Sequence, residues 1–308
     1  MIKTVCFLGD SITAGGIWET EIFENARHDK MRFYNCGVSG GNATSAVGRL
    51  YYTCLEKNPD MVSVMFGVND NNCGYYYNKE REPGQLEKEK QEAEEKFELY
   101  KKSMRSLCEM ITGAGAVLVL CTPVPFDNVT PGEMDRDLSI PLDRTIPYIK
   151  ELAAEFGAKL VDFNGEMKKH MQKECIFKAD RVHPNDRGYR LMAQIWSSSM
   201  FDGKYATDAD KEYCICDKLS ERSKIEHILH FVRLVEFCFF ADLRNKDDAN
   251  LAERIAEAEA RLEKAKAGDY PRAQTEVEWY TTYLENINRL DKLEGEYTKL
   301  TIELAEGK

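Results

Sequence analysis

The sequence predicts an α/β protein, in which helices cover both faces of a parallel sheet, followed by an all-helical C-terminal extension. Over about the first 200 residues, short apolar runs alternate with longer segments of helical periodicity, as in βαβ units. The apolar runs are continuous rather than alternating, as expected for strands buried on both faces. Beyond residue 203 the strand-like runs stop and helical periodicity continues.

The elements of the first part follow from this pattern. Gly113-Ala114-Gly115 and Gly157 each end a helical segment just before an apolar run, the usual place for a glycine at a helix C-terminus. The expected strands are Val5–Leu8, Met31–Asn35, Met61–Phe66, Ala116–Cys121 and Lys159–Val161. The expected helices are Thr44–Glu56, Leu86–Thr112, Leu142–Phe156 and Pro184–Phe201.

Residues 1–203 and 204–308 are therefore expected to form two domains. The second contains an apolar helix, Ile225–Phe240, and then a helical hairpin over about residues 247–308, broken at Gly268-Asp269-Tyr270-Pro271. Such a hairpin buries too little apolar surface to be stable alone. We expect it to pack on the first domain or on a second copy of the chain, with a homodimer preferred. Its two apolar seams are Leu251, Ile255, Ala258, Leu262 and Ala265, and Leu290, Leu293, Tyr297, Leu300 and Leu304.

Composition narrows the possible partners. The chain has 308 residues and a net charge of −11, with 53 acidic against 42 basic residues, which disfavours nucleic acid and anionic membranes. Met1-Ile2-Lys3-Thr4 leads straight into the first strand, and no apolar run is long enough to cross a bilayer. The ten cysteines are scattered without zinc-like pairing, which suggests free thiols in a reducing compartment. We expect a cytoplasmic protein that needs no metal or cofactor.

Four short segments carry the chemistry. Gly9-Asp10-Ser11-Ile12-Thr13 directly follows the first strand, where an α/β enzyme places a nucleophile, although Asp-Ser is also a common helix N-cap. The other three are Asn35-Cys36-Gly37-Val38-Ser39-Gly40-Gly41, Gly67-Val68-Asn69-Asp70 and Asp180-Arg181-Val182-His183-Pro184.

In this order and spacing, the four segments resemble the SGNH (GDSL-type) hydrolase superfamily over about the first 200 residues. The resemblance implies a flavodoxin-like fold and hydrolysis of esters or thioesters by a serine nucleophile. Carried over by position, Ser11 is the nucleophile, His183 the base and Asp180 its partner. The Ser11 amide, Gly40 and Asn69 form the oxyanion hole. The helical extension resembles no family.

The residue types suit these roles. A serine hydroxyl needs a base to become nucleophilic. In a loop, a spacing of three lets Asp180 fold back to one ring nitrogen of His183 while the other faces Ser11. Asp10 is expected to fix the turn around the serine, and Asp70 to be structural.

The expected substrate is a short-chain ester, chiefly an acetyl ester of a small carbohydrate, because the tyrosine-rich loop Gly74–Tyr77 suits a polar alcohol. Alternatives from the same fold are a lysophospholipase or a thioesterase. A metal-dependent phosphoesterase would use Asp10, Asp70, Asp180 and His183, yet such sites usually need several histidines or clustered carboxylates. In a further alternative, the helical extension binds a partner and is itself the functional part.

Overall fold

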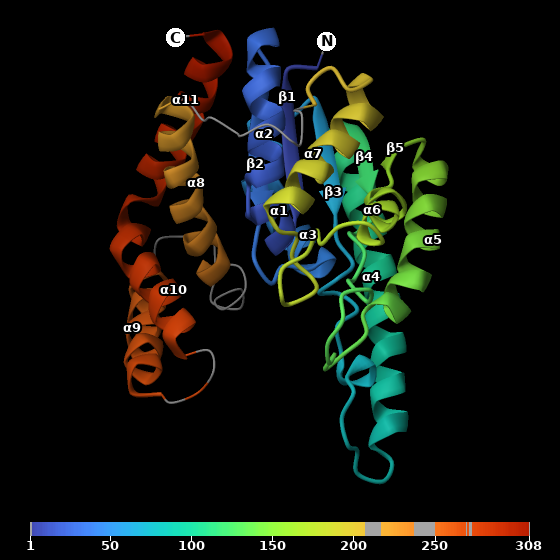
Figure 1. Cartoon of the computed structure of the whole chain (residues 1–308). Helices are drawn as coiled ribbons and strands as arrows, with labels where there is room; N and C mark the ends of the chain where they lie inside the picture. The colour runs from blue at the N-terminus through green and yellow to red at the C-terminus, as the bar shows by residue number, and fades with distance from the viewer. Residues whose placement is uncertain (1, 207–216, 237–249, 269, 271–272, 308) are drawn as a thin grey trace.

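The computed structural model describes residues 2–206, 217–236, 250–268, 270 and 273–307. Residues 2–206, the α/β part, contain a five-stranded sheet in the order β2-β1-β3-β4-β5 with every pair parallel (Figure 1). This is the flavodoxin-like order, so the predicted fold class is confirmed. The strands are β1 Thr4–Gly9, β2 Arg32–Gly37, β3 Met61–Met65, β4 Val117–Cys121 and β5 Lys159–Val161.

The two faces of the sheet have separate hydrophobic cores. In β1 the side chains alternate, so that Val5 and Phe7 join the core under one set of helices and Cys6 and Leu8 join the other. The first set is α2 Ile17–Ala26, α6 Phe163–Met171 and α7 Asp186–Phe201. The second set is α3 Ala43–Thr53, α4 Gln85–Gly113 and α5 Ser139–Phe156.

Some elements differ from the expectation. Helices α2, α6 and the short α1, Ser11–Ala14, were not predicted. Helix α7 begins at Asp186 rather than at Pro184, because the side chain of Asn185 accepts the Gly188 N–H at 3.0 Å and caps the helix. Pro184 instead forms an isolated bridge with Phe177.

The described extension contains four helices, α8 Asp217–Leu234, α9 Leu251–Ala267, α10 Ala273–Asn286 and α11 Leu290–Glu306. Thus the 247–308 region holds three helices rather than a two-helix hairpin: α9 and α10 pair, and α11 packs on α8 and β2. The predicted break near Gly268 separates α9 from α10. The aromatic stretch Phe237–Phe240 lies outside the described residues.

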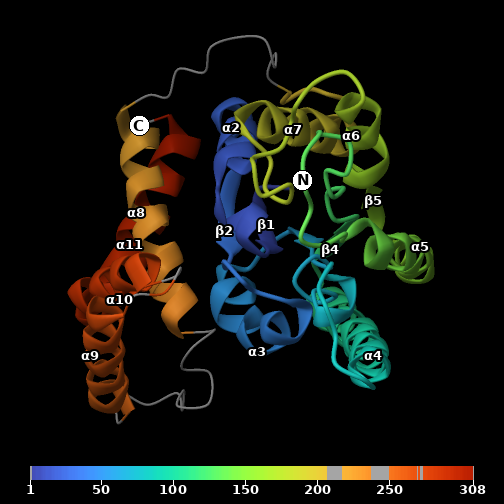
Figure 2. The same cartoon turned by 60° about the horizontal axis from the view of Figure 1, so that its bottom comes forward.

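The extension covers the β2 edge of the sheet (Figure 2). Arg222 donates to the Phe33 carbonyl at 2.7 Å and Arg233 to the Asn35 carbonyl at 3.0 Å. The Asn35 N–H donates to the Tyr297 hydroxyl at 3.1 Å. Side chains of the extension therefore satisfy main-chain groups that an edge strand otherwise leaves open to another chain.

The apolar seams of the extension are used within the chain. Ala258 and Tyr283 are buried in a small core between α8, α9 and α10, and Leu293 and Tyr297 join a core of the sheet. The homodimer and the division into two domains stay predictions. In the described parts of the chain, no helix combines the length and apolarity needed to cross a bilayer.

Candidate active site

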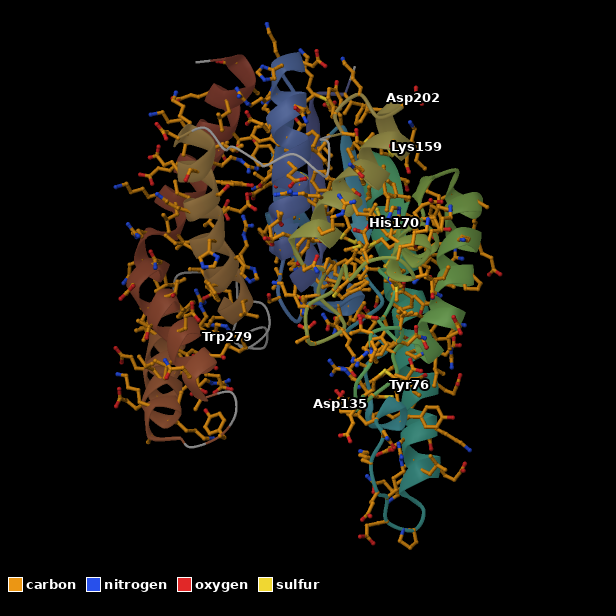
Figure 3. All side chains as sticks on the ribbon, in the orientation of Figure 1. Tyr76, Asp135, Lys159, His170, Asp202 and Trp279 are labelled. Atoms are coloured by element: carbon orange, nitrogen blue, oxygen red, sulfur yellow. The ribbon has the colours of Figure 1, made fainter. Side chains whose placement is uncertain are left out.

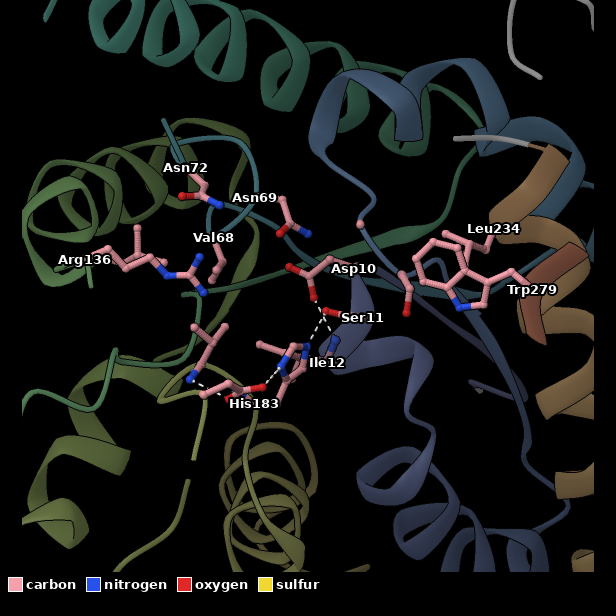
Figure 4. A pocket seen from close by; sticks show the side chains of 15 residues that line it. Asp10, Ser11, Ile12, Val68, Asn69, Asn72, Arg136, His183, Leu234 and Trp279 are labelled. Carbon is pink, nitrogen blue, oxygen red and sulfur yellow. Dashed lines mark hydrogen bonds and ion pairs between the residues drawn. The ribbon is translucent and has the colours of Figure 1, made fainter. Parts of the chain in front are cut away.

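The predicted site residues meet at the carboxyl edge of the sheet (Figure 4). Ser11, Gly40 and Asn69 follow β1, β2 and β3 respectively, and β1 is where the strand order reverses. Open α/β sheets form their ligand crevice at such a point. Asp180 and His183 reach the same place from the loop before α7.

A hydrogen-bonded chain links three of these side chains. The Ser11 Oγ lies 2.8 Å from His183 Nε2, and His183 Nδ1 lies 2.7 Å from Asp180 Oδ2. Burial acts to raise the pKa of Asp180, but N–H donors from His183 and Val182 outweigh it and hold the pKa below its usual value. The carboxylate therefore stays charged and can orient the imidazole toward the serine.

The expected oxyanion donors surround the serine. Gly40 has a φ of +70°, a left-handed conformation that favours glycine, and a Cβ built there would meet no atom within 4 Å. Backbone conformation, rather than lack of space, therefore explains the glycine. The Asn69 Nδ2 donates to the Gly41 carbonyl at 2.9 Å, which fixes the amide. An amide nitrogen carries two hydrogens, so a second N–H remains for an oxyanion.

Two buried aspartates brace these loops. Asp10 accepts the Ile12 N–H at 3.0 Å and caps α1. Asp70 accepts the Ala43 N–H at 2.7 Å and the Gly67 N–H at 3.0 Å, so it ties the loop after β3 to the start of α3. Burial raises the pKa of Asp10 to about 7 and that of Asp70 to about 6. Both carboxyl groups are engaged by the backbone, in keeping with structural roles.

The structure does not gather the four residues of the phosphoesterase alternative into a ligand set. Within the described ranges, one group of three or more acidic, histidine or cysteine side chains has all its ligand atoms within 4.8 Å. It consists of the fully buried Cys6, Cys36 and Cys54, none of which lines the cavity around Ser11.

That cavity has a volume of about 390 Å³ and includes residues that the motifs did not reveal. Arg136 and Leu138 come from the loop between β4 and α5. Asn72, just before the tyrosine-rich loop Gly74–Tyr77, also lines the cavity, whereas Tyr77 accepts a hydrogen bond from Arg136 Nη1 at 2.7 Å. Tyr77 therefore positions an arginine, and none of the three tyrosines of the loop is among the residues that line the cavity.

The extension also contributes residues to the site, which no pattern in the sequence predicts. Leu234 at the end of α8 and Trp279 on α10 line the cavity. His230 Nε2 lies 2.9 Å from the hydroxyl of Ser39, the residue before Gly40. Burial, reinforced by the nearby His227 and Arg233, lowers the pKa of His230 to about 3, so its ring is neutral.

Known proteins are similar to this chain at two levels: a family profile matches residues 7–191, and one solved structure matches almost the whole chain. The sequence profile of the GDSL-like Lipase/Acylhydrolase family matches residues 7–191. No curated protein sequence matches the chain. The structure of a gut microbial diltiazem-metabolizing enzyme, BT4096, is 17% identical with a TM-score of 0.72, covering 99% of this chain and 95% of its own.

Two acetylxylan esterases are similar over about two thirds of the chain. Axe2 from Geobacillus stearothermophilus is 19% identical with a TM-score of 0.51, and the match covers 68% of this chain and 97% of that protein. The acetyl xylan esterase AlAXEase is 22% identical with a TM-score of 0.50, covering 64% of this chain and 100% of its own.

Proposed function

Because the chain belongs to the GDSL-like lipase/acylhydrolase family and is a serine ester hydrolase, we propose that it removes acetyl groups from small carbohydrates. In this proposal Ser11 is the nucleophile, His183 the general base and Asp180 the residue that orients His183. The observation that carries the proposal is the continuous hydrogen-bonded chain from the Ser11 hydroxyl through His183 to Asp180.

The reaction takes two steps. In the first, Ser11 Oγ attacks the ester carbonyl while its proton passes to His183 Nε2. The bond to the alcohol oxygen then breaks, and His183 returns the proton to that oxygen. In the second, water attacks the acyl-serine by the same route, which releases the carboxylic acid and restores the hydroxyl.

Negative charge develops on the carbonyl oxygen in both steps. The backbone N–H groups of Ser11 and Gly40 and the Asn69 amide are the proposed donors to it. Loss of one such donor typically costs about 2.7–4 kcal/mol of transition-state stabilisation.

A small apolar recess supports a short acyl group. It shares Val68, Leu138 and Val182 with the main cavity and has a volume of only about 10 Å³. A space of this order takes no group much larger than a water molecule or a methyl, so it excludes a long acyl chain and favours short acyl esters over lysophospholipids. The remaining lining residues of the recess are Val124, Pro125, Phe126 and Leu142.

The alcohol part is inferred from the main cavity. Its volume of about 390 Å³ is within the range of small-ligand sites, and its lining includes polar side chains suited to hydroxyl groups, among them Ser39 and Asn69. The similar Axe2 structures include a serine-to-alanine and a histidine-to-alanine substitution, each described as a catalytic mutant. A cytoplasmic location stays a prediction.

The test is hydrolysis of p-nitrophenyl esters of increasing acyl length and of acetylated methyl pyranosides. Ser11→Ala and His183→Ala should each lower kcat by more than about 10³-fold, and the double variant should be little worse than either, because the two residues share a step. Ser199→Ala, on the exposed side of α7, is the matched control.

Three results would contradict parts of the proposal. Wild-type turnover in Ser11→Ala would exclude the serine mechanism. A preference for long acyl chains or thioesters would favour the lysophospholipase or thioesterase alternative. Loss of activity in EDTA that returns with a divalent metal would favour the phosphoesterase.

A further inference from the structure

The cavity around Ser11 has walls from two distant parts of the chain. Most of its lining comes from the α/β part, whereas Leu234 and Trp279 belong to the extension. Trp279 lies on the side of the extension that faces the α/β part (Figure 3). In the close view, Trp279 and Leu234 stand on one side of Ser11 and Arg136 on the other (Figure 4).

We propose that Trp279, backed by Leu234, binds the alcohol part of the ester and selects alcohols that carry a ring. The extension is then a substrate-binding part of the enzyme and not only a cover for the sheet edge. This inference rests on the proposed ester hydrolysis at Ser11.

The position of the acyl recess indicates that the wall formed by Trp279 and Leu234 contacts the alcohol part of the ester. The recess is lined by Val68, Leu138 and Val182, and Val68 stands on the Arg136 side of Ser11. An acyl methyl placed there leaves the rest of the cavity for the other half of the ester. That remaining space is closed by Leu234 and Trp279.

The chemistry of the wall favours a ring. An indole offers a broad flat apolar face, and aromatic faces gain specific stacking energy beyond the area they bury. Ser39 and Asn69 also line the cavity, so polar groups share it with the indole. A pyranose, with an apolar face and hydroxyl groups around its rim, matches both features, and an aromatic ring matches the first.

Packing fixes the orientation of Trp279 and Leu234, so this wall can discriminate between alcohols of different shape. The indole packs against the small core of Val232, Val235 and Tyr283, and Leu234 is itself buried. The same helix α8 is anchored to β2 through Arg233 and the Asn35 carbonyl. A binding residue supported in this way keeps its orientation without the substrate.

The experiment compares specificity ratios in full-length protein. For wild type, Trp279→Ala and Trp279→Phe, kcat/KM is measured with an acetylated methyl pyranoside, phenyl acetate and ethyl acetate, by proton release. Trp279→Ala should lower the ratio of pyranoside to ethyl acetate about tenfold or more, through KM rather than kcat, and Trp279→Phe should recover part of it. The phenyl acetate series shows which kind of ring the wall prefers.

Tyr270→Ala, in the same hairpin but outside the cavity lining, is the control for disturbed packing. Equal losses on all three esters, or no change of the ratio in Trp279→Ala, would overturn the inference while leaving the esterase intact. A wild-type protein that hydrolyses none of the esters would overturn the proposed function and this inference with it. If Trp279→Ala fails to fold, an unchanged ratio in Trp279→Leu would be the overturning result.

Discussion

The carboxyl group of Asp10, next to the proposed nucleophile Ser11, holds its proton to near-neutral pH. Asp10 is 2% exposed, and burial raises its pKa to about 7, against about 3.9 in an unfolded chain. At a pH between these two pKa values, Asp10 is ionised in the unfolded state and protonated in the folded state. The contribution of Asp10 to stability is therefore fully present below about pH 4 and is lost as pH rises to about 7.

Asp10→Asn should remove this dependence while keeping the cap on α1, because asparagine is an equally good N-cap. The stability of the variant relative to wild type should rise by a few kcal/mol at most between pH 4 and 7 and then level off. Urea denaturation at several pH values measures it, with the exposed Asp143→Asn as the control. Parallel stability curves for wild type and Asp10→Asn would contradict the assignment.

At the scale of elements, α8 supports the loop that follows β2. The neutral His230 contacts the Ser39 hydroxyl, and Ser39 precedes Gly40, the proposed oxyanion donor. His230 does not line the cavity, so we regard it as a positioning residue that acts through the loop.

His230→Ala should lower kcat about tenfold with little change in KM, because a displaced Gly40 N–H weakens transition-state binding more than substrate binding. His230→Gln, which keeps a polar group near Nε2, should restore part of kcat. His227→Ala, one turn earlier and exposed, should behave as wild type. Steady-state kinetics with phenyl acetate measure kcat and KM for each variant. A change confined to KM would show instead that His230 contacts substrate.

The elements also show what the sequence could and could not predict. The strands and the site loops were predictable, because continuous apolar runs and short motifs are local signals. The α6 helix has only a short signal, Phe163, Met167 and Met171 at steps of four. Trp279 had none, because an aromatic residue in an amphipathic helix looks the same whether it faces a core or a cavity.

On the scale of the whole molecule, a buried charge cluster joins the extension to the α/β part. Arg222 is fully buried and donates to Glu19 at 3.1 Å, to Glu226 at 3.0 Å and to the Tyr297 hydroxyl at 2.8 Å. Burial raises the pKa of Glu19 to about 8, so at neutral pH the Arg222 guanidinium is balanced by the Glu226 carboxylate, and removal of the arginine leaves that carboxylate uncompensated in the interior.

Arg222→Met should therefore destabilise the protein by about 3–5 kcal/mol. Adding Glu19→Gln and Glu226→Gln should recover much of that loss, since it removes the stranded charge. Arg289→Met, an exposed arginine of the same extension, is the control. Denaturation followed by circular dichroism measures the free energy of unfolding, and a triple variant no more stable than Arg222→Met would show that packing, not charge, dominates.

The shared cavity has a thermodynamic consequence. A ligand that fills it touches Ser11 on the sheet edge and Trp279 on the extension, so ligand occupancy and the docking of the extension are linked equilibria. Occupancy favours the docked arrangement by RT ln(1 + [L]/Kd), and tighter docking must raise ligand affinity by the same coupling energy. Substitutions at the buried interface between the extension and the α/β part, far from Ser11, would then change the affinity of the cavity for its ligand. Bound substrate would in turn stabilise the contact between the two parts.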